Sequence, residues 1–377
     1  MMISYERMSD HLMSIIRIDS ESRFEKDVAL VLEKEMKEIG GECFYDDCGE
    51  KVGGNTGNLI VKIKGNTDAP PFFLCSHMDT VAPGKGIKPS IKDGIMRSDG
   101  TTILGSDDKS GVSIIVEVVR SLKERDLPHG DIEIAFMICE EVGLLGAKFI
   151  DCSVFESSYG IVLDSSTPDR LVLKCPASDR IKVKITGVEA HAGLCPEDGV
   201  SAIEIASKAI AKMNLGRIDS ETTANIGTIS GGSAINIVPG ETEVIGEARS
   251  HNTEKLAVQM DHMRKCFEKA STEVCGDTSA VQIEQEHIYF PMDVPPSSEI
   301  AKMVEETANN LGHPVALHTS GGGCDANYIN GKGIQCVNLG TGMYDLHTVD
   351  EHLVIEEFNR SADIVLRTIM KNAGHQN

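Results

Sequence analysis

The sequence contains no tryptophan, and aromatic residues make up only 4% of its 377 residues. It also has no uninterrupted apolar run of about 18 residues, the length that a membrane-spanning helix needs, so an integral membrane protein is excluded. The eleven cysteines form no C-x-x-C pair and lie mostly in apolar, strand-like segments. Structural zinc sites built from thiolates are therefore not expected.

Basic residues are scarce as well, because 36 Lys and Arg stand against 58 Asp and Glu, a net charge of −22. A chain this acidic is repelled by phosphate backbones and by anionic lipid surfaces, so neither nucleic acid nor a membrane is expected as a partner. The N-terminal segment lacks the basic and long apolar regions of a signal peptide. Together with the unpaired cysteine pattern, this predicts a cytoplasmic protein.

The first and last parts of the chain alternate between strand-like and helix-like patterns, which is typical of an open α/β sheet. Phe72–Cys75 is a continuous apolar run, which predicts a central parallel strand buried on both faces. Asn58–Lys64 alternates between apolar and polar residues, which predicts a strand with one exposed face. The other elements predicted for these parts are helices within 9–40 and at 109–123, 144–149, 298–311 and 355–370, and strands at 132–138, 160–163 and 334–339.

The pattern changes in the middle of the chain, where Ile181–Ile185 alternates strictly and carries charge on one face. A helix at 201–213, two strands at 224–229 and 241–248, a helix at 254–270 and a strand at 281–286 follow. This β-α-β-β-α-β order is the split βαβ arrangement of ferredoxin-like modules. We therefore predict one α/β domain made of residues 1–178 and 290–377, with a ferredoxin-like domain of residues 179–289 inserted in it.

Acidic and histidine side chains follow the predicted strands of the larger domain at five places. Ligands of open α/β sheets bind beyond the carboxyl ends of the strands, so these residues are the first candidates for a site. The five places hold His77 with Asp79, Asp107 with Asp108, Glu140 with Glu141, Asp164, and His347.

Each place also has a simpler interpretation. A His-x-Asp pair is often an ordinary loop pair, the two aspartates could cap the helix that follows them, and the two glutamates could be a solvated strand end. Asp164 could form an Asx turn, and Thr348–Glu351, just after His347, could be a capping box. The set as a whole favours metal binding, because two nitrogen and several oxygen ligands at one sheet edge suit two zinc or similar ions about 3.5–4 Å apart. The residues thus predict a two-metal hydrolase.

Four motifs resemble those of the co-catalytic zinc peptidases of the peptidase T and glutamate carboxypeptidase group, and the resemblance spans nearly the whole chain. It implies a zinc-peptidase-type α/β sheet domain with an inserted lid and dimerisation domain. It also implies hydrolysis of short peptides by a homodimer. The motifs are Ser76–Val81, Gly105–Gly111, Glu140–Gly143 and His347.

The resemblance implies two zinc ions per subunit, at a site whose His and carboxylate ligands would also accept cobalt or manganese. His77 and Asp164 would hold one ion, and Glu141 and His347 would hold the other. Asp107 would bridge the two ions.

The resemblance also implies catalytic roles for three further residues. Asp79 would orient His77, and Glu140 would be the general base that takes a proton from the attacking water and passes it to the leaving amine. His191 would reach into the partner subunit's site and stabilise the oxyanion. Asp108 would support the site from behind or cap the helix.

Asn236, Arg249, Gly322 and Gly323 match positions that contact substrate in this group. An arginine can bind a peptide carboxylate through two parallel hydrogen bonds, although an ion pair with one of the many nearby acids is the simpler role. The chain departs from peptidase T at Gly321, where an arginine would help to hold the C-terminus of a tripeptide. Strict tripeptidase specificity is therefore not implied.

Three hypotheses remain at this point. The first is a dinuclear zinc aminopeptidase for short peptides, with the inserted domain closing over the substrate. The second is an amidohydrolase for N-acyl amino acids, which would share every metal ligand and differ only in its pocket. The third is a non-catalytic protein that keeps the metals for stability, and Glu140 disfavours it, because a scaffold has no use for an unliganded base.

Overall fold

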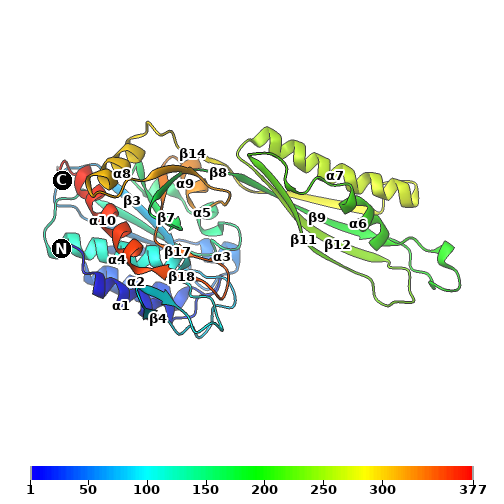
Figure 1. Ribbon diagram of the computed structural model, residues 1–377, viewed down its shortest axis with the longest axis horizontal. Helices are drawn as coiled ribbons and strands as arrows, with labels where there is room; N and C mark the ends of the chain where they lie inside the picture. Colours follow the sequence, from blue (N-terminus) through cyan, green and yellow to red (C-terminus); the bar gives the residue numbers. More distant parts are fainter. Residues whose placement is uncertain (1, 376–377) are drawn as a thin grey trace. The chain divides into compact units, whose positions relative to one another are not determined.

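The computed structural model describes residues 2–375 and divides the chain into two compact units, each described here by itself (Figure 1). Unit 1 holds the chain up to Cys175, Met292–Ser320 and the chain from Cys324 onward; unit 2 holds Pro176–Pro291 and Gly321–Gly323. The prediction placed Gly321–Gly323 in the larger domain, whereas they belong to unit 2. Gly323 packs so closely on Tyr289 of that unit that a Cβ would lie 2.5 Å from its ring. No helix of the described residues is long and apolar enough to span a membrane.

Unit 1 is built on a nine-stranded mixed sheet with the order β1-β2-β6-β3-β7-β16-β8-β14, in which β15 also pairs with β8. Strand β3 lies inside the sheet and runs parallel to β6 and β7, so the predicted central parallel strand and the α/β class are confirmed. The strands are β1 (Glu42–Tyr45), β2 (Leu59–Ile63), β3 (Phe72–His77), β6 (Ile132–Met137), β7 (Tyr159–Ser165), β8 (Arg170–Cys175), β14 (Met292–Asp293), β15 (Ala316–Thr319) and β16 (Gln335–Gly340).

The prediction that one face of β2 is exposed is wrong. Four of its five residues are buried, and only Lys62 is partly exposed. The ammonium of Lys62 lies 3.1 Å from the buried carboxylate of Glu133 and donates to the backbone oxygen of Val154. The polar residue of this face is therefore paired inside unit 1 and only partly exposed to water.

Helix α4 (Ser106–Glu124) packs on β3 and β7, between α1 (Tyr5–Ile16) and α10 (Ile355–Asn372) (Figure 1). The buried residues of α10 include Phe358, Ala362, Val365 and Ile369, a helical spacing that forms one apolar face. The remaining helices of unit 1 are α2 (Lys26–Glu38), α3 (Cys48–Val52), α5 (Leu145–Phe149), α8 (Glu299–Asn310) and α9 (Ala326–Gly331).

A small second sheet in unit 1, with the order β17-β18-β5-β4, was not predicted, since strands this short carry no readable period. Its strands are β4 (Ser90–Lys92), β5 (Ile95–Arg97), β17 (Met343–Tyr344) and β18 (His352–Val354). The loop between β17 and β18 carries His347. A strand and not a helix follows Glu351, so the capping-box interpretation is wrong.

Unit 2 is a five-stranded antiparallel sheet with the order β10-β11-β12-β9-β13, and α6 and α7 cover one of its faces (Figure 1). Apart from the short β10, its strands are paired in the order expected for a split βαβ module. The opposite face carries cross-strand ion pairs such as Lys182–Glu243, 3.0 Å. The elements are β9 (Ala177–Thr186), α6 (Ala202–Ala211), β10 (Gly216–Arg217), β11 (Thr222–Gly231), β12 (Glu241–Ser250), α7 (Thr253–Cys275) and β13 (Val281–Tyr289).

We expect Phe267→Ala, in the core of unit 2, to lower the stability of the protein strongly. Phe267 lies on α7, is fully buried and packs in the cluster between the helices and the sheet. Its truncation should cost about 3–5 kcal/mol of unfolding free energy, because a cavity remains where the ring was. The measurement is the urea midpoint together with hydrogen exchange of the α7 amides. Val258→Ala on the same helix, where the side chain is 70% exposed, is the control, and equal effects of the two variants would contradict the packing described here.

Candidate metal centre

The residues predicted as metal ligands come from separate elements that meet at the carboxyl ends of the parallel strands. His77 is the last residue of β3, and Asp164 lies near the end of β7. Glu140 and Glu141 follow β6, and the two remaining residues lie at the start of α4 and in the β17–β18 loop. The structure therefore brings together side chains that are up to 270 positions apart in the sequence.

Asp107 lies between the two histidines. Its Oδ1 is 3.3 Å from His77 Nε2, and its Oδ2 is 3.2 Å from His347 Nε2. His347 Nε2 also lies 3.1 Å from Glu141 Oε2. Three groups place one ligand atom from each member within 4.8 Å of the others: His77 with Asp107 and Asp164, His77 with Glu140 and Glu141, and Asp107 with Glu141 and His347.

Asp107 does not cap helix α4. The assigned helix begins after Gly105, which has no side chain to cap it, and the backbone of Asp107 and Asp108 is not helical. Asp108 instead turns toward β3, where its Oδ2 accepts from the Ser76 hydroxyl, while its Oδ1 accepts from Gly111 N at 3.3 Å. The helix-cap interpretation is therefore wrong for Asp107 but confirmed for Asp108, whose backbone is not helical and whose Oδ1 accepts from the N–H three residues on.

The centre collects negative charge with little to balance it. The positive groups that lower the pKa values of these carboxylates are histidines: His77 and His347 act on Asp107 and Glu141, and His77 acts on Glu140 and Asp164. Burial and the charge of Asp164 raise the pKa of Glu140 well above its ordinary value, and burial and the charge of Asp107 do the same to Asp164. Several buried carboxylates this close together need cations, so the site fits a pair of metal ions.

Two further observations agree with metal binding. Glu141 Oε1 is buried and has no hydrogen-bond partner, so it is available as a ligand. Hydrogen bonds to Asp107 and Glu141 raise the pKa of His347 to about 10, which shows how strongly the carboxylates attract a positive charge. Oxygen and imidazole donors without thiolates suit zinc, cobalt or manganese.

Asp79 connects the loop after β3 to the loop after β6. Its Oδ1 accepts from Glu140 N at 2.9 Å, and its Oδ2 accepts from Glu141 N at 3.2 Å and from the Ser22 hydroxyl at 2.6 Å. His77 Nδ1 lies 3.0 Å from the backbone oxygen of Asp79. This contact leaves His77 Nε2 to face Asp107.

The sequence-based reasoning missed one buried carboxylate beside the cluster. Glu351 is 1% exposed and accepts hydrogen bonds from the backbone of the loop that precedes Asp107. In the sequence, Glu351 stands out only as an acidic residue four positions after His347. The capping-box interpretation assigned it a different role.

Of the residues predicted in unit 2, His191 and Asn236 lie on adjacent loops. Both loops adjoin the start of β12, and Ala192 N donates to the backbone oxygen of Asn236 at 3.0 Å. Both side chains are exposed. The structure therefore brings these two predicted residues together.

Arg249 lies near the other end of β12, where its guanidinium donates to Glu247 in two contacts of 3.1 Å. Gly322 and Gly323 belong to the same end of unit 2, because Gly323 packs on Tyr289, and Tyr289 pairs with the same β9 residue as Arg249. Nearly the whole length of the ten-residue strand β12 thus separates Arg249 from the His191 and Asn236 loops, roughly 30 Å at about 3.4 Å per residue.

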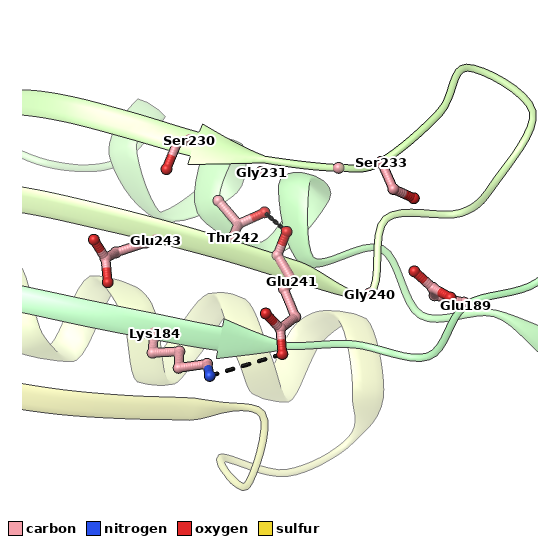
Figure 2. Close-up of a pocket in the computed structure, with 10 residues that line it drawn as sticks. Lys184, Glu189, Ser230, Gly231, Ser233, Gly240, Glu241, Thr242 and Glu243 are labelled. Atoms are coloured by element: carbon pink, nitrogen blue, oxygen red, sulfur yellow. Dashed lines mark hydrogen bonds and ion pairs between the residues drawn. The ribbon is translucent and has the colours of Figure 1, made fainter.

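Unit 2 also has an open pocket of about 530 Å³ at the ends of β9, β11 and β12 (Figure 2). Lys184 and Glu241 form an ion pair of 3.7 Å across it, and the Thr242 hydroxyl donates to the backbone of Glu241. No histidine or cysteine is among its lining residues, so it offers no imidazole or thiolate ligand for zinc, unlike the cluster of unit 1. The residues are Lys184, Glu189, Ser230, Gly231, Gly232, Ser233, Gly240, Glu241, Thr242 and Glu243.

The sequence pattern of peptidase family M20/M25/M40 matches residues 73–371, which include the whole metal-binding cluster. The chain belongs to this family. Its fold is similar to that of the aminopeptidase PepT from Bacillus cereus, with 42% identity, 99% of this chain and 100% of that chain covered, and a TM-score of 0.88. It is also similar to a tripeptidase from Staphylococcus aureus, with 37% identity, 100% of both chains covered and a TM-score of 0.93.

Peptidase T from Fusobacterium nucleatum is 26% identical over 323 residues, which are 85% of this chain and 78% of the relative. The resemblance to peptidase T-like enzymes is therefore confirmed, and so is the prediction that the chain is an enzyme of the peptidase type.

Proposed function

We propose that the chain is a dinuclear zinc aminopeptidase that hydrolyses short peptides. The observation that carries this proposal is the position of Asp107, whose two carboxylate oxygens face His77 and His347 at 3.3 Å and 3.2 Å. A carboxylate held between two imidazoles in a buried acidic cluster is suited to bridge two cations. The similar Bacillus protein is an aminopeptidase and the similar Staphylococcus protein a tripeptidase, which supports a peptide substrate.

Five residues would hold the two ions. His77 and Asp164 would bind one, Glu141 and His347 would bind the other, and Asp107 would bind both, in agreement with two of the three groups of neighbouring ligand atoms. Zinc bound in this way supplies Lewis acidity toward the peptide carbonyl and a water nucleophile at neutral pH.

Glu140 would act as the general base. Its carboxylate is buried and lies within 4.8 Å of ligand atoms of His77 and Glu141. Its position allows it to take a proton from the attacking water and to return it to the leaving amine. Asp79 would position both His77 and Glu140, because it contacts the His77 ring and also accepts from the backbone N–H of Glu140.

A panel of substrates tests the proposed reaction. The purified protein, loaded with zinc or cobalt, is assayed against di- and tripeptides with a free amine, the same peptides with a blocked amine, and N-acyl amino acids. Cleavage of the free-amine peptides alone is expected. Cleavage of acylated compounds alone would instead establish the competing amidohydrolase activity.

We also infer that the chain works as a homodimer in which His191 serves the partner's site. A tripeptide spans at most roughly 11 Å, whereas His191 and Arg249 lie near opposite ends of β12, a ten-residue strand. The two side chains of one copy therefore cannot both contact one short peptide. If both bind substrate, as the resemblance implies, they come from different copies.

Mixing two inactive variants tests this arrangement. His191→Ala subunits and Glu140→Gln subunits are each expected to be nearly inactive alone. A mixed dimer should regain activity, because one of its two sites then combines an intact Glu140 with an intact His191 from the partner. Failure to regain activity, after native mass spectrometry has proven subunit exchange, would contradict action across the dimer.

A cytoplasmic location is part of the same proposal. All the cysteines are free, and most of them are buried. Free thiols in this number are typical of reducing compartments.

A further inference from the structure

We propose that Glu351 is a positioning residue of the metal centre, whose buried carboxylate fixes the loop carrying Asp107 against the loop carrying His347. The inference rests on the proposed two-metal site. It assigns Glu351 no contact with substrate or metal. Its role is to set the position of the residue that would bridge the ions.

The carboxylate of Glu351 accepts five hydrogen bonds from four consecutive residues. Its Oε2 accepts from Leu104 N and Gly105 N, both at 2.8 Å. Its Oε1 accepts from Ser106 N at 2.8 Å, from the Ser106 hydroxyl at 2.7 Å and from Asp107 N at 3.2 Å. Successive backbone N–H groups that converge on one anion fix the course of the backbone around it.

Because these contacts are buried, the N–H groups need the carboxylate as their acceptor. Glu351 is 1% exposed, so water cannot replace any hydrogen bond that is lost. The four N–H groups are buried with it, and a buried donor without an acceptor is destabilising. Gly105 adopts φ +72°, a conformation that favours glycine and directs this stretch of backbone toward the carboxylate.

Glu351 also belongs to the loop that presents His347. It follows His347 by four positions, its N–H donates to Thr348 O at 3.2 Å, and β18 begins at the next residue. The pairing of β18 with β5 and β17 therefore anchors the backbone of Glu351. Because one side chain joins both loops, the contact of 3.2 Å between Asp107 Oδ2 and His347 Nε2 depends on it.

The experiment replaces Glu351 with glutamine in the full-length protein and measures zinc binding by competition with a chromophoric chelator. The glutamine keeps the shape but turns an NH2 group toward N–H donors. We expect zinc affinity to fall by about 10- to 100-fold, the usual effect of losing a residue that supports metal ligands. We also expect faster hydrogen exchange of the amides of residues 104–107, a readout that does not depend on activity.

Glu133→Gln is the matched control. Glu133 is another buried glutamate of unit 1, 3% exposed, whose Oε2 accepts from Glu156 N and Ser157 N at 2.8 Å each. It lies at the start of β6, whereas the proposed ligands follow the strand's other end. This variant should lose stability but keep the zinc affinity and the loop exchange of the parent.

The outcomes separate this inference from the proposed function. A parent that binds no zinc would overturn both. A parent that binds two zinc ions, with Glu351→Gln matching it in affinity and in exchange of residues 104–107, would overturn the role of Glu351 alone, as would an equal loss of affinity in Glu133→Gln. If Glu351→Gln does not fold, Ser106→Ala removes one hydrogen bond to the same carboxylate. It should weaken zinc binding by about five-fold, and unchanged binding would overturn the inference.

Discussion

Replacing Glu140 with glutamine should lower kcat by about 10²- to 10⁴-fold, the usual contribution of a general base. The amide keeps the size of the side chain but cannot accept the proton of the attacking water. Because the proposed ligands are His77, Asp107, Glu141, Asp164 and His347, the variant should still bind two zinc ions. Steady-state kinetics on a free-amine tripeptide and elemental analysis of the same sample check both statements.

Glu133→Gln serves as the control here too, because Glu133 lies on the strand that precedes Glu140 and is also buried. It should keep kcat close to that of the parent. A Glu140→Gln variant as active as the parent would refute the base assignment, and one that loses zinc would show that Glu140 is a ligand. Its carboxylate lies within 4.8 Å of ligand atoms of His77 and Glu141, so the experiment decides between the two roles.

Replacing Asp107 with alanine should abolish detectable activity and lower the bound zinc further than any other single ligand substitution. Asp107 would bind both ions, so its removal weakens both sites, whereas His347→Ala removes a ligand from one. We expect His347→Ala to retain about one zinc ion per subunit and Asp107→Ala to retain less than one, after dialysis against the same weak chelator. Elemental analysis against protein concentration gives the stoichiometry.

Asp99→Ala is the control for this comparison. Asp99 is an exposed aspartate of unit 1 that pairs with Lys88 at 2.8 Å. It should bind two zinc ions. If His347→Ala loses as much zinc as Asp107→Ala, the bridging role of Asp107 is wrong.

Much of the metal centre could be predicted because ligands of open α/β sheets bind beyond the carboxyl ends of the strands. Phe72–Cys75 and 132–138 are apolar enough to be recognised as buried strands, and parallel neighbours such as β3 and β6 end at one edge of the sheet. Polar residues directly after such strands must therefore lie near one another. This is why the sequence alone groups His77, Glu140 and Glu141.

Contacts between distant loops could not be predicted. Glu351 binds a loop that precedes it by nearly 250 positions, and no local pattern encodes that pairing. The strands β17 and β18, which place His347, are too short to show a period. The burial of β2 also escaped prediction, because it depends on Glu133 meeting Lys62 on the neighbouring strand.

Anomalous diffraction from zinc in crystals of the protein tests the two-metal centre most directly. The account predicts two peaks in unit 1, both in contact with the Asp107 carboxylate. One should lie against His77 and Asp164 and the other against Glu141 and His347. A single peak, or peaks that these residues do not contact, would contradict it.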